Sequence, residues 1–301
     1  MLAMIVAITT PSYAVDGVLE INQACAVNTG CFSGDTAGLP VQITAAGSYR
    51  LTSNLTSSGG LVIDINADAV TVDLNGFGII GPTACSFNAS TRVVTCSPTN
   101  NGSGHGIRGQ GNDITVLNGT ISGMGSFGIL LTNGTSFRVD GVHATANAGY
   151  GIEASNNSLI SKCAARRNGL GGIVSRTLGG NSRFDLNTAY QNGGPGLWIA
   201  DGGVVTGNTS SQNSGDGINC SACMIARNLT NSNGGDGIQS IGGGTVVENR
   251  ASSNLGYGLN LSDSGYAHNV VTTSASSLGT VSGGIQMGAN VNVCDGNTTC
   301  P

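Results

Sequence analysis

Basic side chains gather in one short stretch of a weakly charged sequence. Six of the 11 lysines and arginines fall between residues 138 and 183, together with His143. They are Arg138, Lys162, Arg166, Arg167, Arg176 and Arg183. Because the whole chain carries a net charge of −5, such a basic surface attracts an anionic ligand locally. A uronic-acid polysaccharide is one class of ligand that fits this charge.

Residue type suggests separate catalytic and binding roles within this stretch. A lysine or arginine near a neutralised sugar carboxylate can abstract the adjacent proton, and a tyrosine can protonate the leaving oxygen. The candidate catalytic residues are Lys162, Arg166, Arg183 and Tyr190. The candidate substrate-binding residues are Arg138, Asp140, His143, Arg167, Asp185 and Trp198. The alternative interpretation is a solvated rim in which the same charges form salt bridges.

Asp216 and Asp236 form a second candidate site, for a metal ion. Each stands directly before a Gly-Ile step, and the two are 20 residues apart. If the chain coils with that period, the carboxylates lie about 5 Å apart. That separation raises one pKa, binds a cation such as Ca²⁺, or suits a retaining glycosidase. The alternative is that Asp-Gly simply favours a turn.

Aromatic residues supply a third candidate feature. Phe127 and Tyr150 stand in equivalent positions directly before a Gly-Ile step, and Trp198 is the only tryptophan of the chain. Exposed rings can stack on the faces of sugars. Packing of one ring on the next within the fold is the alternative reason for this pattern.

An internal repeat must position all of these residues. A Gly-Ile or Gly-Leu step recurs at intervals of 20 to 26 residues. Its glycines are Gly106, Gly128, Gly151, Gly172, Gly196, Gly217, Gly237, Gly258 and Gly284. A period near 22 predicts a solenoid. Leucine-rich repeats share this period, but the chain lacks their dense leucine framework.

Columns of like residues keep one register through successive repeats. Asparagine stands four residues before the glycine at Asn147, Asn168, Asn192, Asn213, Asn233 and Asn254. Nine residues before it stand Cys163, Asn187, Asn208, Asn228 and Asn249. Stacked asparagines form amide ladders that satisfy polar groups at interior turns. Cys163 occupies a ladder position, so we interpret it as a small buried thiol rather than a nucleophile.

Composition narrows the fold class to all-β. Only 9% of the residues are charged and 50 of 301 are glycine, whereas a helical bundle needs charged outer faces and few glycines. Six prolines without a three-residue glycine period exclude collagen, and 39% apolar residues argue against disorder. Sixteen acidic against 11 basic residues disfavour a nucleic-acid partner.

The chain divides into successive segments. Residues 1–14 have the pattern of a secretory signal peptide, too short to span a membrane. We expect an N-terminal cap at 15–40 and the solenoid at 41–290. A loop protrudes from it at 81–104, and a tail follows at 291–301.

Nine cysteines indicate a compartment that permits disulfides, so the protein is expected to be secreted, extracellular or periplasmic. Close spacing suggests three local pairs, namely Cys25 with Cys31, Cys85 with Cys96 and Cys294 with Cys300. Cys220 and Cys223 form either a local bridge or two buried thiols.

The segments 47–81 and 114–129, with the Asn-x-x-x-Gly-Ile/Leu coils, resemble secreted bacterial right-handed parallel β-helix repeat proteins. This pectate-lyase-like superfamily includes polysaccharide lyases, hydrolases, epimerases and tailspikes, and the resemblance covers roughly residues 41–290. It implies a single-stranded right-handed parallel β-helix, a β-solenoid of about 22 residues per coil. It also implies an extracellular polysaccharide as partner. Its motifs are specific for the fold rather than the chemistry, because this scaffold hosts many functions.

The sequence departs from these enzymes at their catalytic motifs. It lacks the Trp-x-Asp-His and Arg-x-Pro-x-x-Arg stretches of pectate lyases and the Asp-Pro-His-Glu motif of alginate epimerases. Asn187-Thr188-Ala189 lacks the acid of the polygalacturonase Asn-Thr-Asp block, and His105-Gly106 stands isolated. Whether the protein is an enzyme, as a polysaccharide lyase or glycoside hydrolase, therefore stays open.

Two function classes remain. The first is a secreted β-helix that binds an anionic polysaccharide, and cleaves it if catalytic, through an outward face around coils 138–190. The second is a non-catalytic structural or surface protein, either an adhesin or a filament subunit that self-associates end to end through the solenoid ends. Low charge and polar Ser, Thr and Asn faces are compatible with the second class.

Overall fold

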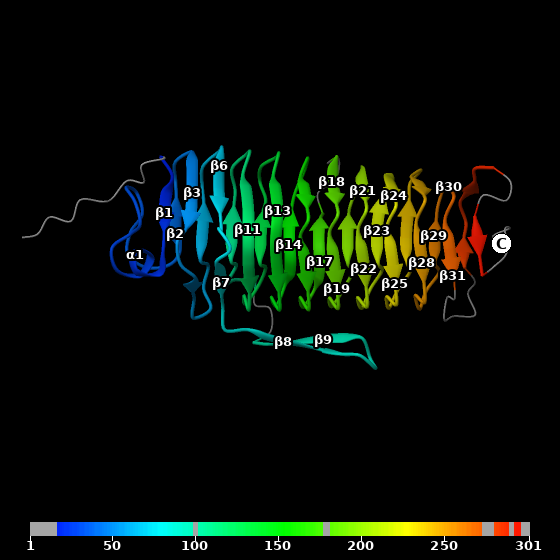
Figure 1. Cartoon of the computed structure of the whole chain (residues 1–301), viewed down its shortest axis with the longest axis horizontal. Helices are drawn as coiled ribbons and strands as arrows, with labels where there is room; N and C mark the ends of the chain where they lie inside the picture. Colours follow the sequence, from blue (N-terminus) through cyan, green and yellow to red (C-terminus); the bar gives the residue numbers. More distant parts are fainter. Residues whose placement is uncertain (1–16, 99–101, 177–180, 273–279, 289–291, 296–301) are drawn as a thin grey trace, which may run out of the picture.

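Eight of the nine predicted Gly-Ile or Gly-Leu steps lie at or near the start of a short strand whose aliphatic residue is buried, and these strands stack in parallel as a β-solenoid (Figure 1). The prediction is wrong for Gly284, because Ile285 is 68% exposed and its strand pairs in a different sheet, with Gly265 opposite Ile285. The computed structural model describes residues 17–98, 102–176, 181–272, 280–288 and 292–295. The first strand of every coil belongs to an 11-stranded sheet, here called face 1. Its strands are β2 (Val41–Ile43), β5 (Ile63–Ile65), β10 (Ile107–Gly109), β12 (Ile129–Leu131), β14 (Tyr150–Ala154), β17 (Gly171–Ser175), β20 (Leu197–Ile199), β23 (Ile218–Ser221), β26 (Ile238–Ile241), β29 (Leu259–Leu261) and β32 (Val281–Ser282).

Face 2 carries the second strand of each coil. It belongs to a 21-stranded sheet that also includes face 3, because β11 and β13 run unbroken around the corner between the two faces. The strands of face 2 are β1 (Leu19–Ile21), β3 (Gly47–Leu51), β6 (Val70–Asp73), the first halves of β11 (Thr115–Ser122) and β13 (Arg138–Thr145), β15 (Leu159–Ser161), β18 (Ser182–Asp185), β21 (Gly203–Thr206), β24 (Cys223–Ala226), β27 (Thr245–Val247), β30 (Gly265–Ala267) and β33 (Ile285–Gln286).

Face 3 carries the third strand and completes each coil. Its strands are β4 (Leu55–Thr56), β7 (Gly78–Ile80), the second halves of β11 and β13, β16 (Ala164–Arg166), β19 (Thr188–Tyr190), β22 (Thr209–Ser211), β25 (Leu229–Asn231), β28 (Arg250–Ser252), β31 (Val270–Thr272) and β34 (Val293–Cys294). The register confirms the predicted repeat, since Ile152 lies opposite Ile129 on one side and Ile173 on the other. Inward aliphatic residues from all three faces form one continuous core.

Both predicted asparagine ladders are confirmed. From Asn147 to Asn254, each side-chain Nδ2 donates to Oδ1 of the next asparagine over 2.9–3.0 Å. The other ladder runs from Asn187 through the successive coils to Asn292 over 3.0–3.2 Å. Cys163 fills a position of this second ladder, and its backbone N–H donates to Asn187 Oδ1. Burial raises the pKa of the Cys163 thiol to about 12, so the thiol stays protonated and is unsuited to act as a nucleophile.

From residue 142 to residue 269, a residue in the left-handed conformation directly precedes each position of the two ladders and turns the chain at the corner. Between faces 2 and 3, φ is 53–66° at Gly141, Lys162, Leu186, Gly207, Arg227, Glu248 and His268. Between faces 3 and 1, φ is 53–57° at Ala146, Arg167, Gln191, Gln212, Ser232 and Ser253. Only two residues separate the strands of faces 2 and 3 here, so the turn needs a positive φ even where the residue is not glycine.

Residues 81–104, predicted as a protruding loop, include an antiparallel hairpin of β8 (Ala84–Asn88) and β9 (Val93–Ser97). A disulfide between Cys85 and Cys96 joins its strands. The hairpin extends alongside the solenoid toward later coils (Figure 1). At its tip, the Arg92 guanidinium donates to the Ser232 carbonyl and the Ser214 hydroxyl donates to the Arg92 carbonyl.

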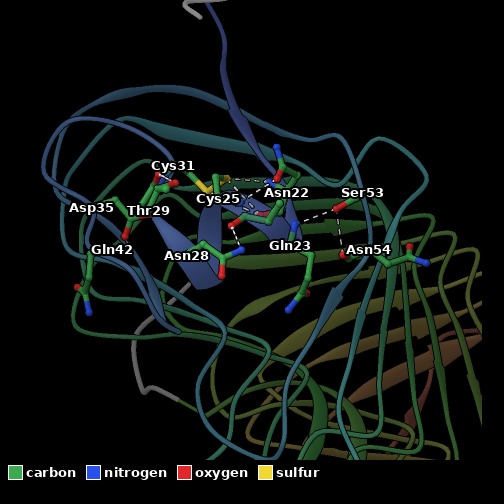
Figure 2. Close-up of a disulfide and its surroundings, with 12 residues drawn as sticks. Asn22, Gln23, Cys25, Asn28, Thr29, Cys31, Asp35, Gln42, Ser53 and Asn54 are labelled. Atoms are coloured by element: carbon green, nitrogen blue, oxygen red, sulfur yellow. Dashed lines mark hydrogen bonds between the residues drawn. A yellow bond between two sulfur atoms is a disulfide. The ribbon is translucent and has the colours of Figure 1, made fainter. Parts of the chain in front are cut away.

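The N-terminal end of the solenoid is covered by α1 (Gln23–Asn28). Asn22 caps this helix by accepting from the Cys25 N–H over 2.9 Å, and the predicted disulfide joins Cys25 to Cys31 (Figure 2). Ala26 of the helix is fully buried. A third disulfide joins Cys220 to Cys223, which settles the two alternatives for this motif in favour of the bridge.

Some predictions fall outside the described residues. These are the signal peptide at 1–14 and Cys300, the expected partner of Cys294. Among the helices that the structure does describe, none has the length and hydropathy needed to cross a membrane.

Candidate functional site

The winding of the chain distributes the predicted basic residues over faces 2 and 3. Arg138 and Arg183 extend from β13 and β18 of face 2, whereas His143 and Arg166 extend from β13 and β16 of face 3. Lys162 lies at the corner between these faces, and Arg167 lies at the far corner of face 3. We call these six residues, from three consecutive coils, the basic surface: Arg138, His143, Lys162, Arg166, Arg167 and Arg183.

On face 2, each arginine pairs with the acid two residues later on its own strand. Arg138 Nη2 lies 2.7 Å from Asp140 Oδ2, and Arg183 Nη2 lies 3.6 Å from Asp185 Oδ2. The two arginine side chains are 53% and 54% exposed. Exposed pairs of this kind contribute little stability, and a guanidinium has further N–H donors. Both arginines can therefore bind a second anion.

On face 3, Arg166 and Tyr190 are in direct contact. The Arg166 guanidinium lies 5.4 Å from the centre of the Tyr190 ring. The Tyr190 hydroxyl accepts a hydrogen bond from Gln191 Nε2 over 3.0 Å, and Gln191 Oε1 accepts from Arg167 Nε over 3.1 Å. Gln191 Nε2 also donates to Gln212. This network links the far corner of face 3 to the Tyr190 ring and restricts the orientation of both.

The four candidate catalytic residues occupy three parts of this surface. Arg166 and Tyr190 form a contacting pair on face 3, Arg183 extends from face 2, and Lys162 lies at the corner between the faces. The cationic side chains therefore lie along one surface that extends from face 2 around the corner to face 3. It is suited to binding an extended anion.

Asp216 and Asp236 occupy equivalent positions of two adjacent coils, at the corner that precedes face 1. Asp216 Oδ1 accepts the Asp236 N–H over 2.8 Å, and Asp236 Oδ1 accepts the Tyr257 N–H over 2.7 Å. Their second oxygens accept from the side-chain amides of Asn219 and Asn260. Burial raises the pKa of the Asp216 carboxyl, and these hydrogen bonds oppose the rise. Each carboxylate thus forms a hydrogen bond between its own coil and the next one.

Potential metal ligands do not cluster in the part of the chain that the structure describes. Residues 17–98, 102–176, 181–272, 280–288 and 292–295 contain no group of three or more His, Cys, Asp or Glu residues that could hold a metal ion. Any calcium ion at Asp216 and Asp236 would have to compete with the backbone and amide donors that already occupy their oxygens.

Two buried ion pairs on face 1 were not found from the sequence. Glu153 is 6% exposed, and both of its oxygens accept from Arg176 at 2.7–3.2 Å. Asp64 is 5% exposed and accepts from Arg108 Nε and Nη2 at 2.9 and 2.8 Å. Burial raises the pKa of Glu153, while the Arg176 guanidinium opposes the rise. The Asp64 and Arg108 positions are neighbours in register, but the inserted hairpin separates them by 44 residues and hides the repeat.

The predicted stacking of Phe127 and Tyr150 is confirmed, with ring centres 5.6 Å apart. The stack of rings continues to His105, whose ring centre lies 5.3 Å from that of Phe127. The Arg176 guanidinium lies 5.1 Å from the centre of the Tyr150 ring. Trp198 lies on face 1, between Val174 and Asn219 in register. It therefore belongs to a different face from the basic surface.

Comparisons with solved structures show the same fold at low sequence identity. The mannuronan C-5 epimerase AlgE4 A-module of Azotobacter vinelandii matches with a TM-score of 0.58 and 15% identity, over 78% of this chain and 72% of that chain. The tailspike protein of the E. coli bacteriophage HK620, solved with a pentasaccharide, matches with a TM-score of 0.56 and 10% identity, over 92% and 56%.

A mutant of the periplasmic alginate epimerase AlgG matches with a TM-score of 0.52 and 13% identity, over 89% of this chain and 71% of that chain. A comparison with curated proteins found no match. The family model described as the right handed beta helix region matches residues 56–204 and 177–276, well over half of the chain. With three strands per coil stacked in parallel register, the chain belongs to the right-handed β-helix family.

Proposed function

We propose that this protein binds an anionic polysaccharide outside the cytosol through the basic surface. The observation that carries the proposal is the gathering of these six residues on three consecutive coils of an acidic protein. Arg138, Lys162, Arg166 and Arg183 are exposed, as is His143. A flexible polymer can contact several of these side chains at once. Because solenoid coils repeat about every 4.8 Å, successive sugars of one chain can meet successive coils.

The chemistry of the side chains favours carboxylated sugars. A guanidinium donates two parallel hydrogen bonds to a carboxylate, and Lys162 adds a point charge between the two faces. The pair of Arg166 and Tyr190 adds an aromatic ring beside a cation, which suits a sugar that has both an apolar face and a carboxylate. Exposed charges are screened by salt, so the affinity should fall steeply with ionic strength.

The folds of similar proteins support the ligand class. The matched structures are named as a mannuronan epimerase, an alginate epimerase and a tailspike in complex with a pentasaccharide. At 10–15% identity they share the fold with this chain, so the ligand itself is proposed from the basic surface.

The proposed location is the periplasm or the extracellular space. Three disulfides join Cys25 to Cys31, Cys85 to Cys96 and Cys220 to Cys223. Disulfides persist in oxidising compartments, which supports export guided by the signal-like residues 1–14. N-terminal sequencing of the protein recovered from its natural host should begin near Val15. A start at Met1 would contradict export by cleavage.

The binding proposal is tested by two matched double variants. Arg138→Ala with Arg183→Ala removes two cations from the basic surface, and Arg227→Ala with Arg250→Ala removes two cations from later coils. Titration calorimetry with polygalacturonate should show a loss of at least tenfold in affinity for the first variant and little change for the second. Equal losses, or no binding by the wild type at low salt, would refute the proposal.

The wild type and one further variant, Tyr190→Phe, test whether binding is followed by cleavage. A lyase step at a uronate leaves an unsaturated sugar that absorbs in the ultraviolet. If Arg166 and Tyr190 carry such a step, Tyr190→Phe abolishes the absorbance while polygalacturonate binding persists. A wild-type protein that binds without any absorbance change is a binding protein.

A further inference from the structure

The turn between faces 1 and 2 contains an open depression of about 460 Å³. Three consecutive coils contribute to it, and we call it the polar depression. Its lining residues are Asn112, Thr132, Asn133, Gly134, Thr135, Ser155 and Asn156. The volume falls in the range of about 300–1,000 Å³ that small-molecule sites occupy. Neither the ion pairs nor the aromatic residues described above contribute to it.

Several polar groups of the polar depression lack partners. Asn156 Oδ1 is buried and accepts no hydrogen bond. Within the described residues, the side chains of Thr132 and Asn133 also make no hydrogen bond. A buried carbonyl oxygen without a donor is unfavourable, so rotation of the Asn156 amide toward the depression, where Oδ1 could accept from a ligand hydroxyl, would remove this cost.

Other groups hold the walls of the polar depression in place. Asn112 Nδ2 donates to Asp68 Oδ1 over 3.3 Å, and its Oδ1 accepts the Thr135 N–H over 3.1 Å. On the opposite wall, the Asn156 carbonyl accepts the Ser136 N–H over 3.3 Å. The walls are therefore ordered before a ligand arrives, which lowers the entropic cost of binding.

The lining chemistry points to an uncharged ligand. Amides and hydroxyls supply all the side-chain polar groups, and no charged residue is among the seven lining residues. An amide both donates and accepts, as does each hydroxyl of a sugar. A carboxylate would find no cation in the depression, so a sugar acid is disfavoured there.

We propose that the polar depression binds a neutral sugar unit of the same polysaccharide. This inference rests on the proposed function. Arg138 begins face 2 three residues after Thr135, a span of at most about 10 Å at 3.3 Å per residue. A polymer with one neutral unit in the depression would place following units against face 2 and its arginines. The substrate class is then a heteropolysaccharide that contains both neutral and acidic sugars.

The site is tested by nuclear magnetic resonance on the ¹⁵N-labelled protein. The probes are millimolar methyl glycosides of glucose, galactose, mannose and rhamnose. Asn133→Ser and Asn156→Ser assign the side-chain amide signals of these residues, and Asn231→Ser on face 3 is the matched control. At least one probe should shift the Asn133 and Asn156 signals and leave the Asn231 signal unmoved. If no probe shifts them, the depression holds only water and the inference fails.

A variant separates binding from folding. The Asn156 side chain makes no hydrogen bond within the protein, so Asn156→Ala should leave the melting temperature unlowered while abolishing the signal shifts caused by the glycosides. A glycoside-induced shift of the Asn133 signal that persists undiminished in Asn156→Ala would show that the sugar does not depend on Asn156 and would overturn the inference.

Polymer binding distinguishes this inference from the proposed function. Polygalacturonate and a rhamnogalacturonan with alternating neutral and acidic units share the acidic sugar. The wild type should bind the alternating polymer several-fold more tightly, and Asn156→Ala should remove that preference without weakening polygalacturonate binding. Equal affinities in the wild type would overturn the neutral subsite alone, whereas no binding of either polymer would overturn the proposed function.

Discussion

Arginine is used in two contrasting ways on two sides of this solenoid. On face 1, Arg176 and Arg108 each make bidentate contacts to a carboxylate that is less than 10% exposed. On face 2, Arg138 and Arg183 make single contacts to partly exposed carboxylates, and their own side chains are more than half exposed. The number of contacts and the burial of the partner, rather than residue type, separate a structural arginine from one available to a ligand.

This contrast has a physical basis. A buried carboxylate that loses its cation is left without compensation, whereas an exposed carboxylate is rehydrated at once. Face 1 should therefore respond to substitution through stability, and face 2 through binding. The following predictions can break or sharpen that division.

The largest effect is expected on face 1. Arg176→Ala should lower the free energy of unfolding by about 1–3 kcal/mol, because the buried Glu153 carboxylate loses its bidentate cation and the Tyr150 ring loses the neighbouring guanidinium. Urea denaturation measures the change. Arg138→Ala on face 2 is the matched control, and its free energy of unfolding should stay within about 0.5 kcal/mol of the wild type. A control as destabilised as Arg176→Ala would contradict the distinction between the faces.

A pH series should isolate the charge of Glu153. Its folded pKa is raised above 4.5 by burial, so the folded protein binds this proton more tightly than the unfolded chain. The stability from this group is fully present below the unfolded pKa and is lost as pH rises through the folded pKa. Relative to Glu153→Gln, the wild type should thus lose stability as the pH increases through this window. A difference that grows in the opposite direction would show that Arg176 dominates over burial.

A smaller effect of opposite sign is expected at the corner of the basic surface. Lys162 has φ of 53°, so Lys162→Gly should raise the free energy of unfolding by about 0.5–1 kcal/mol relative to Lys162→Ala. Both variants should weaken polygalacturonate binding equally, because both remove the same charge. Thermal unfolding and calorimetry together check this. Unequal binding losses would mean that the backbone of this corner, rather than its charge, contributes to recognition.

The sequence was sufficient for the repeat, the ladders and the burial of Cys163. Each depends on local spacing, and Asn192 to Asn213 is one period like any other. The distribution of residues over faces was harder to predict, because Trp198 and Arg183 are close in sequence yet lie on different faces. Equivalent positions in the repeat predict which residues stack on one another from coil to coil. They do not predict toward which face each stack of residues points.

Contacts across the hairpin could not be predicted. Arg92 reaches Ser232, which is 140 residues away, and no periodic signal connects the two. The same insertion hid the pair of Asp64 and Arg108. The polar depression was also missed, since Asn133 and Asn156 stand in turns whose lengths vary from coil to coil, and their missing partners can be seen only in the folded chain.

Hydrogen exchange with and without oligogalacturonate tests the central claim most directly, because it reports on every face in one measurement. The account predicts protection confined to peptides that cover 138–145, 159–167 and 182–190, with no change in peptides of face 1 at 150–154 and 197–199. Protection centred on face 1, or an exchange pattern that the ligand leaves unchanged at low salt, would contradict it.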